Sequence, residues 1–82
     1  MGKFQTKKGR VLESELAKYM IMQRINSKEQ LRQLTTVGSN RTILKYFDDP
    51  EAMPIGTLIQ IMTALRIPKE ERLQIMSQLL EI

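Results

Sequence analysis

The stretch from Ser27 to Phe47 constrains the fold of this 82-residue chain most strongly, because two helix-start signals lie close together in it. Ser27 is followed three residues later by Gln30, which is the pattern of a capping box, and Ser39 stands ahead of a second helical run. Between them lie Thr and Val residues, which are weak helix formers, and Gly38, which we expect to supply the backbone freedom for a turn. The stretch therefore predicts two short helices that meet at a tight joint.

Each of these two helices has an apolar side that other helices must cover. The first is expected to bury Leu31 and Leu34. The second is expected to bury Ile43, Leu44 and Phe47. This layout is typical of a helix-turn-helix, whose second helix lies in the DNA major groove with its N-terminal residues at the bases. The exposed positions of that second helix are expected to be Asn40, Arg41, Thr42 and Lys45.

Helical spacing of apolar residues predicts three further helices. The first runs from Val11 to about Arg24, the fourth from Gly56 to Leu65, and the last from Pro68 to the C-terminus. The prolines and glycine of residues 48–56 exclude a continuous helix there. The predicted fold is therefore all-α, a single five-helix domain over residues 11–82. The stripe of the first helix is Leu12, Leu16, Tyr19, Met20 and Met22, and that of the fourth is Leu58, Ile61, Met62 and Leu65.

Residues 1–10 are predicted to form a basic flexible N-terminal arm, because they are polar and punctuated by glycine, with Phe4 as the one large apolar side chain. Two interpretations remain open for this arm. It is either an untethered chain end or an arm that contacts DNA in the minor groove.

Positive charge is concentrated in two parts of the chain. Residues 1–10 carry a net charge of +4, and residues 24–47 carry five basic side chains and one acidic one, also a net +4. Residues 48–82 carry a net −3. The basic charge thus lies on the arm and on the predicted helix-turn-helix, where contact with phosphates would require it.

Several functional classes are disfavoured by composition. The chain has no His and no Cys, so it lacks the usual transition-metal ligands and the usual base for a Ser or Cys nucleophile. The adjacent carboxylates at 48–49 and 70–71 cannot face each other across a cleft. We therefore expect no enzyme activity, no cofactor, no metal and no small-molecule substrate. No apolar run suits a membrane span and no signal-peptide core is present, so we expect a cytoplasmic protein without membrane contact.

The order of the helices and three local patterns resemble the Cro/repressor-type (XRE-family) helix-turn-helix domain of phage and plasmid regulators. The patterns are Ser-x-x-x-Leu at Ser27, Ser-Asn-Arg-Thr-Ile at Ser39, and Pro-x-x-x-Leu-x-x-Ile-x-x-Ala-Leu from Pro54 to Leu65. The resemblance covers roughly Val11 to Leu73. It implies a five-helix Cro/repressor-like domain that binds double-stranded DNA.

The resemblance also implies roles for individual residues. Ser39 would cap the recognition helix and touch a phosphate, and Lys28 would meet the DNA backbone. Ile43 and Tyr46 would pack inward. The residues that would face base edges are Asn40, Arg41 and Lys45.

Three features of this chain differ from the family pattern. Arg32 stands where the family usually has a small residue, so its stem must bend outward or the crossing of the two helices must open. Between Leu31 and Ile43 there is one residue more than usual. The loop after the recognition helix is acidic, with Asp48, Asp49 and Glu51.

The last helix has two apolar stripes, which is more than a peripheral helix needs to dock on one side. We expect Leu73, Met76 and Leu80 to face the core of the chain, and the second stripe to meet a second copy in a homodimer. The residues of this expected dimer interface are Ile75, Leu79 and Ile82.

The first functional hypothesis is a sequence-specific DNA-binding transcriptional regulator, a repressor that binds as a homodimer to a two-fold-related operator. The second is a protein-interaction adaptor or antirepressor that keeps the fold and binds protein through the acidic loop and the C-terminal helix. A third, architectural or nonspecific nucleic-acid binding, would need only the basic charge.

Overall fold

A computed structural model describes residues 5–81, and within that range the chain contains helices and turns but no strand. Five α-helices and one short 3-10 helix are present in this described part of the chain. Their bounds are α1 (Lys7–Met22), α2 (Lys28–Arg32), α3 (Asn40–Asp48), η1 (Pro50–Ala52), α4 (Ile55–Ala64) and α5 (Lys69–Leu80). The prediction of five helices is confirmed. Phe4 and Ile82 lie outside the described residues.

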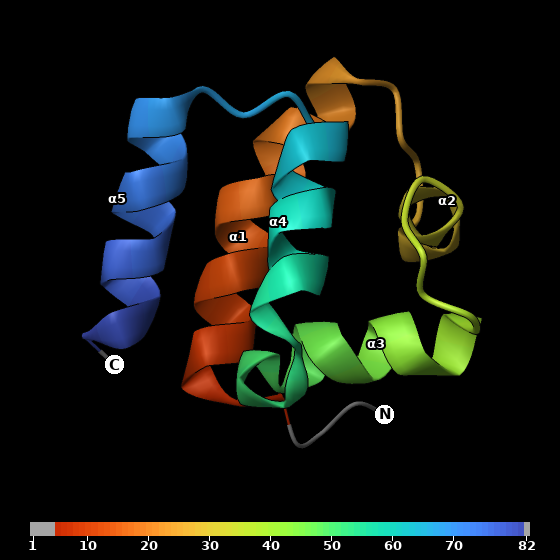
Figure 1. Cartoon of the computed structure of the whole chain (residues 1–82), viewed down its shortest axis with the longest axis horizontal. Helices are drawn as coiled ribbons and strands as arrows, with labels where there is room; N and C mark the ends of the chain where they lie inside the picture. Colours follow the sequence, from red (N-terminus) through yellow and green to blue (C-terminus); the bar gives the residue numbers. More distant parts are fainter. Residues whose placement is uncertain (1–4, 82) are drawn as a thin grey trace.

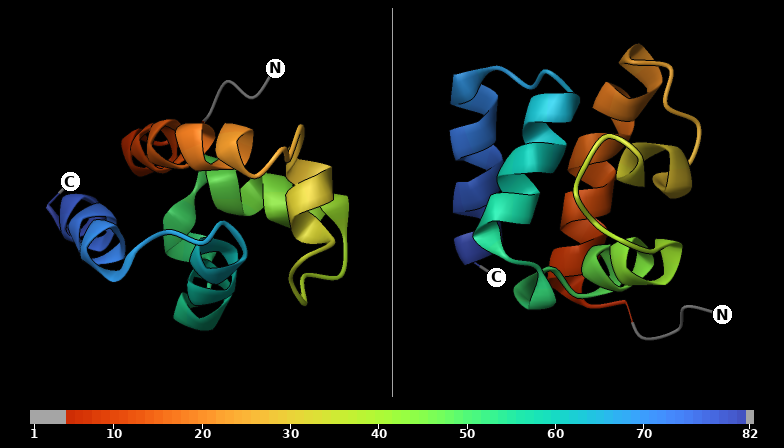
Figure 2. Two further views of the ribbon diagram at one scale, coloured as in Figure 1. Left: turned by 90° about the horizontal axis from the view of Figure 1, so that it is seen from above. Right: turned by 45° about the vertical axis from the view of Figure 1, so that its right-hand side comes forward.

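The helices form two groups that share one core. α1, α4 and α5 stand side by side, with α5 running opposite to the other two, while α3 lies across the end where α1 and α4 begin (Figure 1). α2 lies at the far side of α3 and crosses it, so the α2–α3 pair forms one flank of the molecule (Figure 2). The closest backbone packing joins α1 to α3, α2 to α3 and α1 to α5. α3 is therefore held from both sides.

The first helix begins earlier than the sequence predicted. Thr6 is its N-cap, and the Thr6 hydroxyl accepts a hydrogen bond of 3.0 Å from the backbone N–H of Gly9. Lys7 to Arg10 are therefore helical, and the prediction of a flexible arm over residues 1–10 is wrong for residues 6–10. The arm is predicted from composition alone, which reveals neither that Thr6 caps a helix nor that Gly9 packs against α3.

Gly9 is the point of closest approach between α1 and α3. A Cβ atom at this position would lie 2.5 Å from the carbonyl oxygens of both Phe47 and Asp48, which is closer than real Cβ atoms come. Thr6 adds two hydrogen bonds to the carbonyl of Asp48, from its backbone N–H at 2.8 Å and from its hydroxyl at 2.9 Å. The N-terminal turn of α1 thus satisfies carbonyls left unpaired at the C-terminus of α3.

The two predicted N-caps of the central stretch are confirmed. The Ser27 hydroxyl accepts from the backbone N–H of Gln30 at 3.2 Å, and the Gln30 side chain accepts from the backbone N–H of Asn26 at 2.7 Å. The Ser39 hydroxyl accepts from the backbone N–H of Thr42 at 3.2 Å. Both helix starts therefore follow from local side-chain chemistry.

α2 is shorter than the sequence suggested, and the prediction that Leu34 is buried is wrong. The helix ends at Arg32, where the hydroxyl of Thr35 donates to the Arg32 carbonyl at 2.8 Å. Leu34 therefore leaves the helical stripe and is 55% exposed. Gly38 differs from expectation as well, because no described glycine has a positive φ and an added Cβ at Gly38 would meet no atom within 4 Å.

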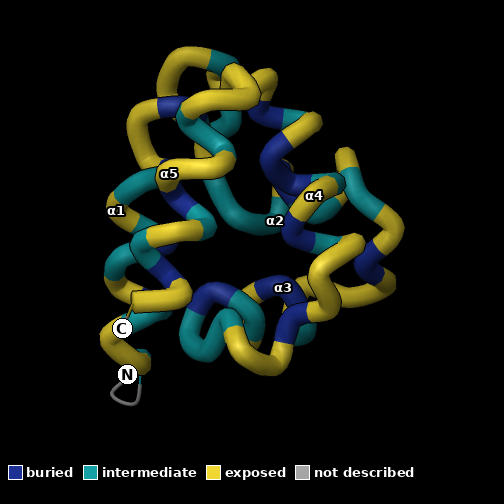
Figure 3. Tube along the Cα trace, turned by 60° about the vertical axis from the view of Figure 1, so that its left-hand side comes forward, coloured by how far each residue is buried: buried dark blue, intermediate teal, exposed yellow. Residues whose placement is uncertain are grey.

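The core draws on every α-helix, as the alternation of buried and exposed segments along the trace shows (Figure 3). The predicted stripe of α4 is confirmed, because Leu58, Ile61, Met62 and Leu65 are all buried. The stripes of α1 and α3 are confirmed for most members. Two exceptions are Met22, which is 67% exposed beyond the last packed turn of α1, and Leu44, which lies at the edge of the core and is 38% exposed.

Arg24 and Arg66 end α1 and α4 in the left-handed backbone region, with φ of 59° and 57°. Each is followed by an isoleucine whose N–H bonds back to a carbonyl five residues earlier, Ile25 to Met20 at 2.8 Å and Ile67 to Met62 at 3.1 Å. This is the pattern of a Schellman motif. Glycine, the residue usually found at such positions, is absent from both.

Four described members of the two α5 stripes are exchanged relative to the prediction, whereas Met76 is half-buried against the core, as predicted. Ile75 and Leu79 are buried against the core, at 1% and 8% exposure, while Leu73 and Leu80 are 59% and 83% exposed. The expected dimer interface of Ile75, Leu79 and Ile82 is therefore wrong for its two described members, because they pack within their own chain. Sequence could not choose between two equally apolar stripes, since the docking of α5 beside α1 decides which one is covered. None of the described helices is long and apolar enough to cross a membrane.

Replacing Gly9 by Ala should destabilise the fold. The new methyl group would overlap two backbone carbonyls that cannot swing away, and overpacking of this kind costs about 1–3 kcal/mol. Urea unfolding followed by circular dichroism measures the change in the free energy of unfolding.

Gly38→Ala is the matched control, because the same methyl group enters open space there. It should be neutral or stabilising by about 0.4–1 kcal/mol, through the lower entropy of the unfolded chain. Equal losses for the two variants would contradict the close contact at Gly9.

Candidate nucleic-acid interface

The exposed face of α3 is polar and basic over its first two turns. Arg41 and Lys45 lie four residues apart, and are thus neighbours on one face, and both are exposed. Within residues 5–81 neither makes an ion pair. The first acidic residue of the helix is Asp48, at its last position. This face therefore presents two cations that are available to a ligand.

The N-terminus of α3 is fixed by α2 through Arg32. The Arg32 Nε donates to the side-chain oxygen of Asn40 at 2.6 Å, and its Nη1 donates to the carbonyl of Val37 at 3.2 Å. The long Arg32 side chain thus lies along the joint between α2 and α3, where it bonds to both sides of the turn. Because its oxygen is occupied, Asn40 keeps its amide NH₂ as the group free to donate.

Ser39 and Thr42 bond to each other as well as to the backbone. Their hydroxyl oxygens lie 2.9 Å apart, in addition to the capping bond from the Thr42 N–H. Ser39 is exposed, whereas Thr42 is half-buried. The Thr42 hydroxyl is thus engaged within the first turn, so Arg41, Lys45 and Asn40 are the better placed of the predicted contact residues.

Lys28, expected at the DNA backbone, turns back toward α1. Its Nζ lies 3.0 Å from a carboxylate oxygen of Glu13, and 5.2 Å from the centre of the buried Phe47 ring. Glu13 also accepts a hydrogen bond of 2.6 Å from the side-chain amide of Gln5. Gln5, Glu13 and Lys28 therefore form a chain of side chains that links the N-terminal segment, α1 and the start of α2.

This chain of contacts changes the acidity of Glu13. Partial burial alone would raise the pKa of the Glu13 carboxyl, but the hydrogen bonds from Gln5 and Lys28, together with the charge of Lys28, outweigh it and lower the pKa. The ionised form of Glu13 is thus the form that the fold favours.

The acidic loop after α3 is partly neutralised by α1. The ammonium group of Lys8 is bonded to the carboxylate of Glu51, and this hydrogen bond, followed by the charge of Lys8, lowers the pKa of Glu51. Two lysines of the predicted basic arm therefore differ: Lys8 forms an ion pair with Glu51, whereas the side chain of Lys7 is exposed to solvent. An acidic loop repels phosphates, and the ion pair with Lys8 reduces this repulsion at Glu51.

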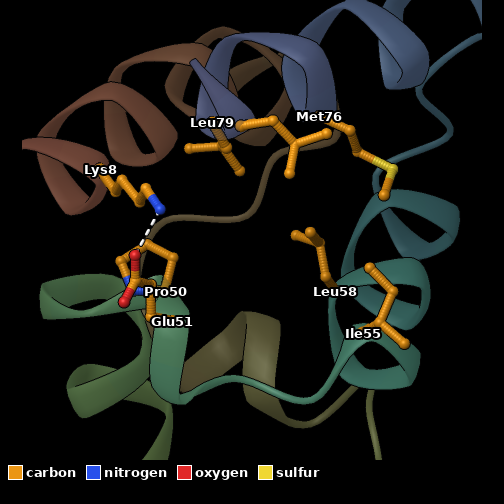
Figure 4. A pocket seen from close by; sticks show the side chains of 8 residues that line it. Lys8, Pro50, Glu51, Ile55, Leu58, Met76 and Leu79 are labelled. Atoms are coloured by element: carbon orange, nitrogen blue, oxygen red, sulfur yellow. Dashed lines mark hydrogen bonds and ion pairs between the residues drawn. The ribbon is translucent and has the colours of Figure 1, made fainter. Parts of the chain in front are cut away.

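A second surface lies away from this polar face, at an apolar groove between α4 and α5. The groove encloses about 160 Å³, and Figure 4 shows Ile55 and Leu58 of α4 facing Met76 and Leu79 of α5 across it. The ion pair of Lys8 with Glu51 lies at one end beside Pro50, and the exposed Leu80 also lines the groove. Uncovered apolar surface of this kind is typical of a binding site.

Sequence reasoning missed the roles of Gln5, Glu13 and Arg32 in this interface. Glu13 and Lys28 are 15 positions apart, so no helical spacing signals their ion pair. The Arg32–Asn40 bond depends on the angle at which α2 meets α3, which no local pattern reveals. Among the described residues no group of acidic side chains could hold a metal ion.

The free energy of unfolding should decrease as the pH is lowered, and part of this decrease should come from Glu13. Because the pKa of Glu13 is lower in the folded state, the unfolded state binds the proton first as the pH falls. Ionised Glu13 therefore stabilises the fold at pH values above the ordinary pKa of a glutamate. This stabilisation is lost as the pH falls through the pKa of the folded state. Urea unfolding at a series of pH values should show wild type losing more stability on acidification than Glu13→Gln.

Glu15→Gln serves as the control, since Glu15 lies on the same helix and makes no ion pair within the described range. The difference in stability between wild type and Glu13→Gln should be small, because the Glu13 side chain is 44% exposed. Parallel pH curves for wild type and Glu13→Gln would show that the ion pair is absent in solution.

No family model matches this chain, and neither a curated protein nor a solved structure does so. The function is therefore inferred from the arrangement of its own residues.

Proposed function

We propose that this protein is a sequence-specific DNA-binding transcriptional regulator, a repressor, in which α2 and α3 form a helix-turn-helix and α3 enters the major groove of double-stranded DNA. The observation that carries the proposal is the exposed pair Arg41 and Lys45 on a helix whose two ends are both anchored to neighbouring helices. The function requires neither catalysis nor a cofactor.

The anchoring matters because base recognition requires fixed geometry. A nine-residue helix is too short to be stable alone in water. Here α3 is capped by Ser39, bonded to Arg32 at its first turn and to Thr6 at its last. A preorganised helix loses less conformational entropy on binding, so more of the contact energy contributes to affinity.

The chemistry of the exposed face suits the edges of base pairs. The Arg41 guanidinium has the fork geometry that pairs with O6 and N7 of guanine, and the Asn40 amide NH₂ can donate to an acceptor in the major groove. Lys45, one turn further along, supplies a charge for a base or a phosphate. Architectural binding would need charge alone, whereas this face combines charge with directional donors.

Arg41→Ala tests the assignment. It should weaken binding to the cognate site by about 1–3 kcal/mol and relax the sequence preference, because a bidentate base contact is lost. Fluorescence anisotropy over a salt series, with DNA flanking the protein's own gene and with unrelated DNA, measures both effects.

Lys69→Ala is the charge-matched control, since Lys69 is exposed and is the first residue of α5, a helix that begins at the end of the molecule opposite α3 (Figure 1). It should leave the preference between the two DNAs unchanged. Equal losses on both DNAs for Arg41→Ala would refute a base contact and favour nonspecific binding.

We also propose that the protein binds DNA as a homodimer, through the exposed sides of α4 and α5. One module reads only a few base pairs, so two copies on a two-fold site are a common route to specificity. Leu73, Met76 and Leu80 share one side of α5 by helical spacing. Ile55 of α4 lines the apolar groove together with Met76 and Leu80. Leu80 is 83% exposed beside that groove, so two copies related by a two-fold axis could each insert Leu80 into the groove of the other.

Leu80→Glu should dissociate this dimer without unfolding the chain. The side chain is exposed in the monomer, so a charge there costs little until a second copy covers it. Sedimentation equilibrium should show a monomer with unchanged circular dichroism, and DNA affinity should fall.

Gln74→Glu introduces the same charge at another exposed position of α5 and should leave the dimer intact. If the wild type is already a monomer, the homodimer is refuted. The exposed apolar surface then favours the second candidate function, an adaptor or antirepressor that binds another protein with α4 and α5.

A further inference from the structure

The ion pair between Glu13 and Lys28 lies where a nucleic-acid backbone would approach the start of α2. Lys28 is the first residue of α2, on the same flank of the molecule as α3. Yet its ammonium group is 3.0 Å from the Glu13 carboxylate rather than directed into solvent. A phosphate that bound Lys28 would have to replace Glu13.

The ion pair is accessible to such a competitor. The side chains of Lys28 and Glu13 are 25% and 44% exposed, and both line an open groove of about 350 Å³ between α1, the start of α2 and Leu44 of α3. The lysine stem can therefore rotate outward without disturbing the core. Because both groups remain in contact with solvent, their attraction is weak enough for a phosphate to compete with it.

We propose that Glu13 is a positioning residue that competes with DNA phosphate for Lys28, and so sets the affinity of the protein for DNA below the value that its cationic surface would otherwise give. This inference rests on the proposed DNA-binding function. The intramolecular pair holds Lys28 against Phe47 in the free protein, and binding exchanges one oxygen anion partner of the ammonium group for another. The net gain from Lys28 is then the difference between two similar contacts.

Gln5 holds the Glu13 carboxylate in the position from which it competes for Lys28. Its side-chain amide donates to the second oxygen of the Glu13 carboxylate at 2.6 Å, which fixes the carboxylate on the side where Lys28 reaches it. A glutamine at position 13 would keep an oxygen acceptor for Gln5 but lose the charge that holds Lys28. Glu13→Gln is therefore a conservative variant that separates charge from packing.

Glu13→Gln should raise the affinity for duplex DNA by about twofold to fivefold at low salt, since an exposed ion pair no longer has to be broken. The control is Glu29→Gln, which removes the same charge from the same groove, where Glu29 makes no ion pair within the described range. It should raise affinity less. In a Lys28→Gln background the gain from Glu13→Gln should fall to that of Glu29→Gln, because only the general effect of removing a negative charge is left. Thermal melting should show each variant folded.

The outcomes distinguish this inference from the proposed function. Equal gains for Glu13→Gln and Glu29→Gln when Lys28 is present would overturn the competition while leaving DNA binding intact. So would a gain from Glu13→Gln that still exceeds that of Glu29→Gln after Lys28 is replaced. A loss of affinity on Glu13→Gln would show instead that Glu13 presents Lys28 to the backbone, and would also overturn it. If wild type binds no duplex DNA, the proposed function fails, and this inference fails with it.

Discussion

The backbone contact between the first turn of α1 and the last turn of α3 determines most of this arrangement. Only a residue without a side chain lets the two helices approach as closely as Gly9 does, and the approach allows Thr6 to satisfy the Asp48 carbonyl. It brings the electropositive N-terminal end of α1 to the electronegative C-terminal end of α3, which is electrostatically favourable. Once α3 is held there, α1 and α2 are brought close enough for Glu13 to reach Lys28, and the basic face of α3 is directed to solvent.

The same contacts that stabilise the fold also limit what the candidate interface can offer. Of the cations near the α2–α3 pair, Lys28 is held by Glu13 and Arg32 by Asn40 and Val37, which leaves Arg41 and Lys45 with no such partner in the described part of the chain. A count of positive charges along the sequence therefore overstates the number available to phosphates. Directional contacts from a few well-placed side chains become correspondingly more important to the proposed recognition.

Local sequence signals predicted the features that depend on local chemistry. The caps at Ser27 and Ser39 and the buried stripe of α4 follow from spacing within a single helix, and all were confirmed. The features that depend on contacts between distant segments could not be predicted in this way. The start of α1 at Thr6 depends on Asp48, the direction of Lys28 depends on Glu13, and the burial of Ile75 and Leu79 depends on how α5 docks beside α1. In α5 two apolar stripes of similar strength compete, so periodicity predicted a helix but could not orient it.

Arg24 and Arg66, which follow α1 and α4 in the left-handed conformation, make this protein less stable than it would be with glycine at those positions. An L-residue in that conformation costs about 1–2 kcal/mol, a cost that glycine avoids. Arg66 is exposed and ends α4 on the side of the molecule opposite α3 (Figure 1). A glycine at this position would stabilise the fold and leave the candidate interface on α3 unchanged. Engineering could begin there, since such a background would tolerate changes to α3 that would unfold the natural chain. The exposed residues of the candidate interface could then be replaced one at a time.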